Sequence, residues 1–215
     1  MKKVAVILSG CGVYDGAEIH EAVLCLLHLA RQGASYQCFA PDKPQHHVVN
    51  HLSGEEEPGS RNVLEEAARI ARGDIKPLTE LKVDDFDALL LPGGFGAAKN
   101  LCDFAAHGAD AQVDPQVLSV CKDFAAARKP AGYCCISPIL MPRVYPAGVK
   151  GTIGTEAAVA EAFTAMGGEH IGCAVTDVVE DSHYQVISTP AYMLAKNITE
   201  ADTGIGKLVK RLLEM

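Results

Sequence analysis

The stretch Lys129-Pro130-Ala131-Gly132-Tyr133-Cys134-Cys135-Ile136-Ser137-Pro138 is a short apolar run that ends abruptly in cysteine and is followed by helix-compatible residues. This pattern is typical of a nucleophile elbow, a sharp strand-to-helix turn that presents one side chain at the carboxyl edge of a sheet. Amides opening the next helix favour negative charge there, so we expect Cys135 to ionise easily. The alternative is that Cys134 and Cys135 are small apolar residues of a buried strand, because free cysteine is often buried.

Short apolar runs of the same kind recur along the chain and indicate buried parallel strands at 4–8, 36–40, 88–91 and 131–134. Between and after them, helices are predicted at 61–72 with Ser60 as a cap, 117–128, 156–166 and 206–213. The alternation predicts one α/β domain over residues 1–215, a doubly wound sandwich with a mostly parallel sheet and helices on both faces. Segments 174–179 and 185–188 flank a polar turn and predict an antiparallel addition to the sheet.

The first helix is predicted to follow a capping box, with Asp15 as the N-cap and Glu18 at the third helical position, and to end at Gly33. Leu24, Cys25 and Leu29 make this helix apolar nearly all round, in addition to its main apolar stripe. We therefore expect a second face of this helix to be buried by another element or by another subunit.

Composition narrows the classes of function. A net charge of -8 with no dense Lys/Arg cluster argues against a nucleic-acid partner, and no apolar run is long enough for a membrane helix. The eight cysteines lie in apolar segments without a CxxC pair, which indicates reduced thiols in a cytoplasm-like compartment. Residues 41–60 read as a solvated surface loop, although loops of that length often cover a site.

Residues that directly follow the predicted strands are the candidates for ligand binding, because ligands of such sheets bind outside the carboxyl ends of the strands. The turns at 9–16 and 91–96 and the Cys135 elbow converge there. Gly93 and Gly94 let backbone amides approach a ligand, which suits an oxyanion site shared with the Ile136 amide. The first turn contributes Gly12 as a further candidate. The glycine spacing in this turn does not match the dinucleotide-binding fingerprint, and the sequence contains no phosphate-binding loop motif.

A reactive thiol needs a proton acceptor, and Glu18, His20 and Glu21 at the start of the first helix are the nearest candidates. Glu18 could serve only as a helix cap, and Glu21 could be a solvated carboxylate on the far side of the apolar stripe. His46, His47 and His51 lack the spacing of a known metal site, so no metal is expected.

Taken together, four motifs resemble one family over essentially the whole chain: 9–16 with Glu18 and Glu21, 92–101, the Cys-Cys-Ile-Ser-Pro elbow, and 189–193. They look like the ElbB-type glyoxalases, also known as isoprenoid-biosynthesis or enhancing-lycopene-biosynthesis proteins. These are a branch of the PfpI-like, class I glutamine amidotransferase-like superfamily.

The resemblance implies a flavodoxin-like homodimer that converts glyoxal-type dicarbonyls to hydroxy acids without a cofactor. It places the nucleophile on Cys135 and its hydrogen-bonded glutamate on Glu21, with Gly12, Glu18, Gly93, Gly94 and Ile136 around the substrate. The usual superfamily histidine after the elbow has no counterpart in this sequence, which argues against a Cys-His amidase or protease. The competing interpretation is a non-catalytic redox or carbonyl sensor that uses the same thiol and acts through a protein partner.

Overall fold

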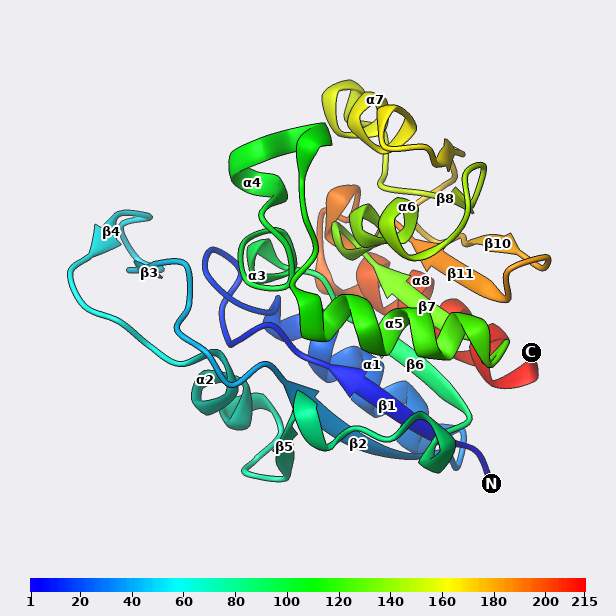
Figure 1. The fold of residues 1–215 in the computed structure, drawn as a ribbon, viewed down its shortest axis with the longest axis horizontal. Helices are drawn as coiled ribbons and strands as arrows, with labels where there is room; N and C mark the ends of the chain where they lie inside the picture. The colour runs from blue at the N-terminus through cyan, green and yellow to red at the C-terminus, as the bar shows by residue number, and fades with distance from the viewer.

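The main sheet of the protein contains seven strands (Figure 1). The structure is a computed structural model that describes residues 1–215. The strands are β1 (Lys3–Ile7), β2 (Ser35–Ala40), β5 (Ile75–Pro77), β6 (Ala88–Leu91), β7 (Ala131–Cys134), β10 (Val179–Asp181) and β11 (Val186–Thr189). Their order across the sheet is β10-β11-β7-β6-β1-β2-β5, and every pair is parallel except β10 with β11. The predicted mostly parallel α/β fold is confirmed.

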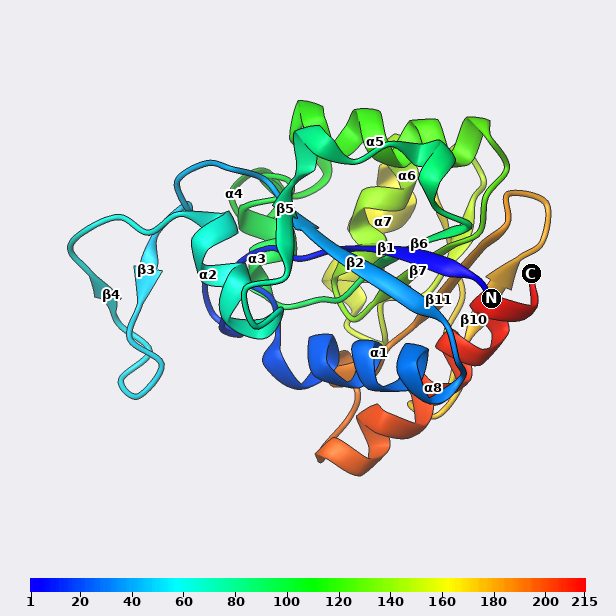
Figure 2. The same ribbon diagram turned by 90° about the horizontal axis from the view of Figure 1, so that it is seen from below.

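Helices cover both faces of this sheet (Figure 2). One face carries α1 (Ile19–Arg31), α2 (Val63–Ile70) and α8 (Ile198–Glu214), and the other carries α5 (Pro115–Ala126), α6 (Met141–Val144) and α7 (Ala157–Ala165). Two short helices, α3 (Phe95–Lys99) and α4 (Phe104–His107), follow β6. No helix has the length and apolarity that crossing a bilayer requires.

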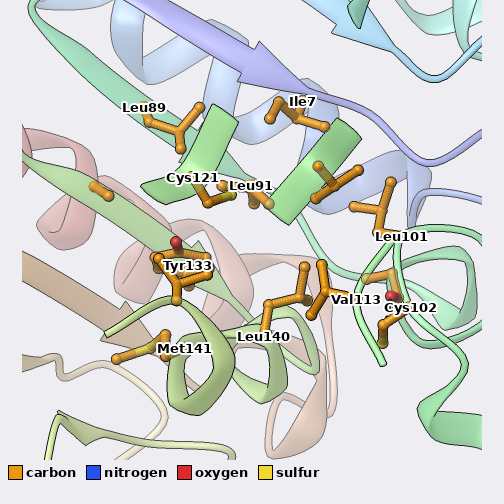
Figure 3. Packing of buried hydrophobic residues seen from close by; sticks show 14 of the residues in the cluster. Ile7, Leu89, Leu91, Leu101, Cys102, Val113, Cys121, Tyr133, Leu140 and Met141 are labelled. Atoms are coloured by element: carbon orange, nitrogen blue, oxygen red, sulfur yellow. Dashed lines mark hydrogen bonds between the residues drawn. The ribbon is translucent and has the colours of Figure 1, made fainter. Parts of the chain in front are cut away.

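Alternate residues of the central strands point into two separate cores, because successive side chains of a strand face opposite sides of the sheet. Ile7 of β1 and Leu89 and Leu91 of β6 belong to the cluster under α5, drawn in part in Figure 3. Val6 and Leu90 belong instead to the cluster under α1 and α8. Burial on both faces explains why these strands read as continuous apolar runs.

The predicted helix starts need correction. Glu18 is itself the N-cap of α1, since its carboxylate accepts a hydrogen bond from the Glu21 amide at 2.7 Å, whereas Asp15 accepts one from Val49 at 2.8 Å. Asn62, rather than Ser60, caps α2 through the amides of residues 64 and 65. Each predicted cap is a polar residue that lies two or three positions before the observed cap.

The last helix is longer than predicted and contains two glycines in its interior. It begins at Ile198 after the Asn197 cap. A Cβ on Gly204 would lie 2.5 Å from the Val175 carbonyl, and one on Gly206 would lie 2.6 Å from the His28 ring. Close packing against neighbouring elements therefore requires the two glycines, whose low helix propensity concealed the first half of the helix.

The predicted antiparallel hairpin is confirmed, because β10 pairs antiparallel with β11 at the sheet edge, although β10 begins at Val179, where the predicted strand ends. β11 itself runs parallel to β7. β5 was not predicted, because it is three residues long. Two small sheets are separate from the main one: β3 (Val48–Val49) with β4 (Glu56–Glu57), and β8 (Lys150–Gly151) with β9 (Glu169–His170).

The strand order places a topological switch between β1 and β6. From β1 the chain moves outward to β2 and β5, and it then returns to the other side of β1 for β6 and β7. Ligand sites of open α/β sheets form at such a switch. The turns after β1 and β6 meet there through three backbone hydrogen bonds, from Phe95 to Val13, from Glu18 to Gly93 and from Gly96 to Gly16.

Candidate functional site

Cys135 occupies a strained elbow directly after β7. Its φ of 59° is in the left-handed region, which is unusual for a residue other than glycine. Ser137 fixes the turn, because its hydroxyl accepts a hydrogen bond from the Cys134 amide and donates one to the Leu91 carbonyl, both at 2.9 Å. The Cys135 amide donates to Thr189 at 3.0 Å. The strain directs one side chain away from the strand, as a nucleophile elbow does.

The two neighbouring cysteines have different surroundings. Cys134 is fully buried, and its sulfur lies 3.9 Å from the sulfur of Cys25 on α1. Cys135 is 7% exposed and lines a pocket. The interpretation of these residues as packing cysteines therefore holds for Cys134, whereas Cys135 faces a space that a small molecule can enter.

Glu21 is the carboxylate beside Cys135. It is fully buried, and its two oxygens accept hydrogen bonds from the amides of Gly93 at 3.0 Å and Tyr192 at 3.1 Å. Tyr192 follows Ala191, whose φ of 44° is also left-handed. Two loops from different parts of the sequence thus aim amides at one carboxylate, which fixes its position next to the sulfur.

Gly93 is required for the contact between these two side chains. A Cβ at this position would lie 2.5 Å from the Cβ of Cys135 and 2.7 Å from Oε2 of Glu21. Gly94 has a φ of 93°, and a Cβ there would lie 2.3 Å from the Glu18 amide nitrogen. The glycine pair lets the turn after β6 approach both the elbow and the start of α1.

Burial raises the pKa of both members of the pair. Desolvation raises the pKa of Glu21 to about 7, more than its hydrogen bonds lower it. Desolvation and the charge of Glu21 raise the pKa of Cys135 well above its ordinary value, although the amides of Gly94 and Ile136 lower it. The prediction that this thiol ionises easily is therefore wrong for the resting protein. Loss of the thiol proton requires a proton acceptor, and Glu21 is the carboxylate in contact with the sulfur.

The pocket above Cys135 has a volume of about 410 Å³. Of the predicted substrate-binding residues, Glu18, Gly94 and Ile136 line it, whereas Gly12 and Gly93 do not. Gly93 lies behind Cys135 and Glu21, and its amide donates a hydrogen bond to the Glu21 carboxylate. The remaining lining residues were not predicted to bind substrate, although the first three and the last two lie in the motifs that carry the family resemblance: Val13, Phe95, Ala98, Phe104, Ala105, Glu156, Val159, Tyr192 and Met193.

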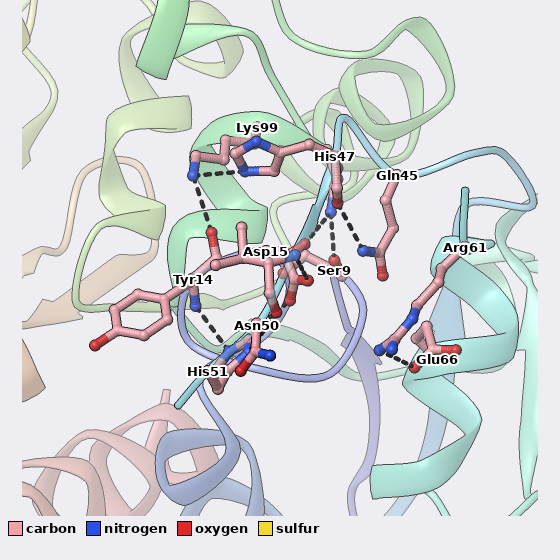
Figure 4. Close-up of polar contacts among 12 residues, drawn as sticks. Ser9, Tyr14, Asp15, Gln45, His47, Asn50, His51, Arg61, Glu66 and Lys99 are labelled. Atoms are coloured by element: carbon pink, nitrogen blue, oxygen red, sulfur yellow. Dashed lines mark hydrogen bonds and ion pairs between the residues drawn. The ribbon is translucent and has the colours of Figure 1, made fainter. Parts of the chain in front are cut away.

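Gly12 serves the loop after β1 instead of the pocket. Its φ is 132°, and a Cβ would lie 2.5 Å from the ring of His51, which comes from the 41–60 segment. That segment is more ordered than the predicted solvated loop, since it forms the β3–β4 hairpin. His51 accepts from the Tyr14 amide at 3.1 Å, and His47 lies 2.9 Å from Lys99 Nζ (Figure 4). His51 thus connects the hairpin to the turn after β1, and His47 connects the same segment to α3.

No histidine lines the pocket. His20 is exposed, and its ring contacts the hydroxyl of Tyr192 at 2.8 Å, which places it on the outer side of a pocket residue. The pocket therefore lacks the Cys-His pair of papain-like amidases. The sequence motif at 189–193 marked the segment of Tyr192, but nothing in it revealed that the Tyr192 amide holds Glu21.

Sequence comparison identifies relatives along the whole chain. The chain is 48% identical to the rat protein named "ES1 protein homolog, mitochondrial", over 99% of this chain and 84% of that one. It is 47% identical to the human "Glutamine amidotransferase-like class 1 domain-containing protein 3, mitochondrial", over 99% of this chain and 83% of the relative. No family model matches the sequence.

Structure comparison agrees. The crystal structure of an "isoprenoid biosynthesis protein with amidotransferase-like domain" from Ehrlichia chaffeensis superposes with a TM-score of 0.93 at 37% identity, covering 100% of this chain and 99% of that one. The flavodoxin-like arrangement expected from the sequence is the fold of that neighbour. The chain belongs to the class I glutamine amidotransferase-like family that includes the ES1 proteins.

Proposed function

We propose that this protein is a cofactor-independent glyoxalase, which converts glyoxal-type dicarbonyls to hydroxy acids through Cys135. The observation that carries the proposal is the placement of the Cys135 sulfur at a pocket wall, against the Glu21 carboxylate and the amides of Gly94 and Ile136. A nucleophile, a proton carrier and two amide donors are the groups that a carbonyl addition needs.

In the first step, the Glu21 carboxylate takes the thiol proton while the sulfur adds to an aldehyde carbon of the substrate. The new C–S bond forms as the C=O π bond breaks, which leaves an alkoxide. The amides of Gly94 and Ile136 face the sulfur before the reaction. We propose that they stabilise the alkoxide once the sulfur has lost its charge, and that Glu21 then returns the proton to this oxygen.

The following steps move a proton between the two carbon atoms. Glu21 removes the hydrogen of the sulfur-bearing carbon as a proton, which leaves an enediolate. The hydroxyl proton on this carbon moves to the neighbouring oxygen, and Glu21 then delivers its own proton to the neighbouring carbon. The first carbon is thereby oxidised to a thioester, and the second is reduced to an alcohol. Water hydrolyses the thioester, so glyoxal and one water give glycolic acid and the free thiol. The balance requires no external oxidant or reductant.

The direct test is the substitution Cys135→Ser, assayed by the release of glycolate from glyoxal. We expect turnover to fall by about 10³-fold or more, because the covalent step is lost. Cys11→Ser is the matched control, since Cys11 is partly exposed on the turn after β1 and does not line the pocket. Retained turnover in Cys135→Ser would refute the proposal.

Turnover also separates this function from the alternatives. A thiol sensor is modified once per subunit, whereas an enzyme releases many equivalents of product. Glutamine hydrolysis would release ammonia, and the absence of a pocket histidine disfavours it. Because the Ehrlichia protein is named as an isoprenoid biosynthesis protein, we propose a physiological connection with isoprenoid biosynthesis. A cytoplasmic location stays a prediction, because the rat and human relatives are named as mitochondrial.

A further inference from the structure

The pocket is far larger than glyoxal, the smallest dicarbonyl, requires. Its volume of about 410 Å³ is within the range of sites that enclose molecules the size of drugs, roughly 300–1,000 Å³. Glyoxal bound at Cys135 would leave most of this space to water. The unfilled part therefore needs its own explanation.

The walls away from Cys135 are apolar and come from separate elements. Phe95 and Phe104 lie on α3 and α4, Val159 lies on α7, and Met193 lies in the turn before α8. Phe104 and Val159 are half-buried and pack against the core under α5. Side chains anchored in this way form a fixed wall that can hold an apolar group of a ligand.

The charged groups of the lining have one sign. Glu18 and Glu156 line the pocket, and Glu21 lies beneath it, whereas no lysine or arginine lines it. Lys99 lies outside the lining, with its ammonium 4.8 Å from the centre of the Phe95 ring. It is hydrogen-bonded to the Tyr14 carbonyl and to His47, both at 2.9 Å. Carboxylates without a facing cation repel an anionic ligand.

We infer that the substrate of this site is an uncharged dicarbonyl with an apolar substituent about the size of an aromatic ring, and that anionic carbonyl compounds are rejected. The inference rests on the proposed function for the reaction and on the lining for the selectivity. The aldehyde lies at Cys135, and the substituent lies between Phe95, Phe104 and Val159. Phenylglyoxal is the probe that has this shape.

The first experiment compares kcat/KM for glyoxal and phenylglyoxal. We expect phenylglyoxal to be favoured by at least about tenfold, because its ring leaves water and contacts the apolar wall in the complex. In Val159→Asn, a polar replacement of similar size, the ratio of the two kcat/KM values should fall several-fold. Equal values in the unsubstituted enzyme, or an unchanged ratio in Val159→Asn, would overturn the inference.

The second experiment measures binding without turnover, by calorimetry on Cys135→Ala. Acetophenone and benzoate are the probes, because they have similar shapes and differ in charge. Acetophenone should bind at least about tenfold more tightly. Glu156→Gln, an uncharged replacement of an exposed residue, should narrow this difference by improving the affinity for benzoate. Benzoate binding as tightly as acetophenone, or no detectable binding of either probe, would overturn the inference.

The two experiments separate failure of the proposed function from failure of the inference. If no dicarbonyl is turned over while acetophenone still binds more tightly than benzoate, the glyoxalase proposal is wrong and the assigned pocket chemistry stands. If glyoxal is turned over without any preference for phenylglyoxal, the reaction stands and the selectivity is wrong.

Discussion

We propose that the reactivity of Cys135 depends on Glu21, because burial has raised the pKa of both groups. A carboxyl group with a pKa near 7 is protonated at lower pH and cannot accept the thiol proton. We expect kcat/KM for glyoxal to rise with pH through about 7 and to level off above it. Glu21→Gln should lose this inflection and lower kcat/KM by about 10²-fold or more.

Glu18→Gln is the control for this pH profile. It changes a neighbouring acid of the same helix while keeping an oxygen that can cap α1. Its inflection should remain but move to somewhat lower pH, because the charge of Glu18 helps to raise the pKa of Glu21. If Glu21→Gln shows the same pH profile as the unsubstituted protein, another group is the proton acceptor.

Gly93→Ala tests the close approach of the turn after β6. The added Cβ would collide with both Cys135 and Glu21, so we expect kcat/KM to fall by about 10²-fold or more. Gly172→Ala is matched to it, because a Cβ there meets nothing within 4 Å and the backbone is not left-handed. Activity of Gly93→Ala equal to that of Gly172→Ala would contradict the geometry described for the pair.

At the residue scale, the elbow could be predicted from a local pattern, and the family resemblance pointed to Glu21. The pKa of the thiol could not be predicted, because it depends on burial by segments distant in sequence. The contact between Gly12 and His51, and the amide of Tyr192 on Glu21, also join distant segments. Spacing within one segment carries no information about such contacts.

At the scale of elements, side-chain caps determine where the helices begin. Asp114 accepts hydrogen bonds from the amides of Gln116 at 3.0 Å and Val117 at 3.3 Å, and it forms an ion pair with Lys43 at 2.6 Å. Asp114→Ala should lower the free energy of unfolding by about 1–2 kcal/mol, measured by urea denaturation. Asp123→Ala, an exposed aspartate of the same helix, should change it by less than about 0.5 kcal/mol. Equal effects would show that Asp114 is not a cap.

The predicted elements are determined by their own residues, whereas the missed ones depend on contacts with other segments. Strands β1, β2, β6 and β7 are apolar runs whose burial is visible in composition. The first half of α8 was missed because its glycines serve contacts with Val175 and His28. The antiparallel pairing of β10 with β11 was predicted from the polar turn between them, whereas the parallel pairing of β11 with β7 joins distant segments and could not be read from either one.

At the scale of the whole molecule, the alternation of strands and helices was sufficient to predict the fold, whereas assembly stays a prediction. Ile19, Val23 and Leu27 of α1 are 42%, 47% and 37% exposed and recur every four residues, so they form one apolar stripe. We expect this stripe to be buried in a homodimer.

Val23→Glu should convert the dimer to a monomer, because it places a charge at the centre of the stripe. Light scattering coupled to gel filtration at micromolar concentration measures the change. Leu52→Glu is the control, since Leu52 is 98% exposed on the hairpin, away from α1, and should leave the dimer intact. A monomeric unsubstituted protein would contradict the prediction.

The central claim, that one sulfur forms a bond with the substrate in each cycle, is tested most directly by stopping the reaction with acid during turnover of glyoxal and mapping the modified peptides by mass spectrometry. The account predicts that Cys135 carries one equivalent of glyoxal while substrate is present, and that this adduct disappears when the glyoxal is exhausted. An unmodified Cys135 in protein that continues to release glycolate, or a persistent adduct after one equivalent without glycolate, would contradict it.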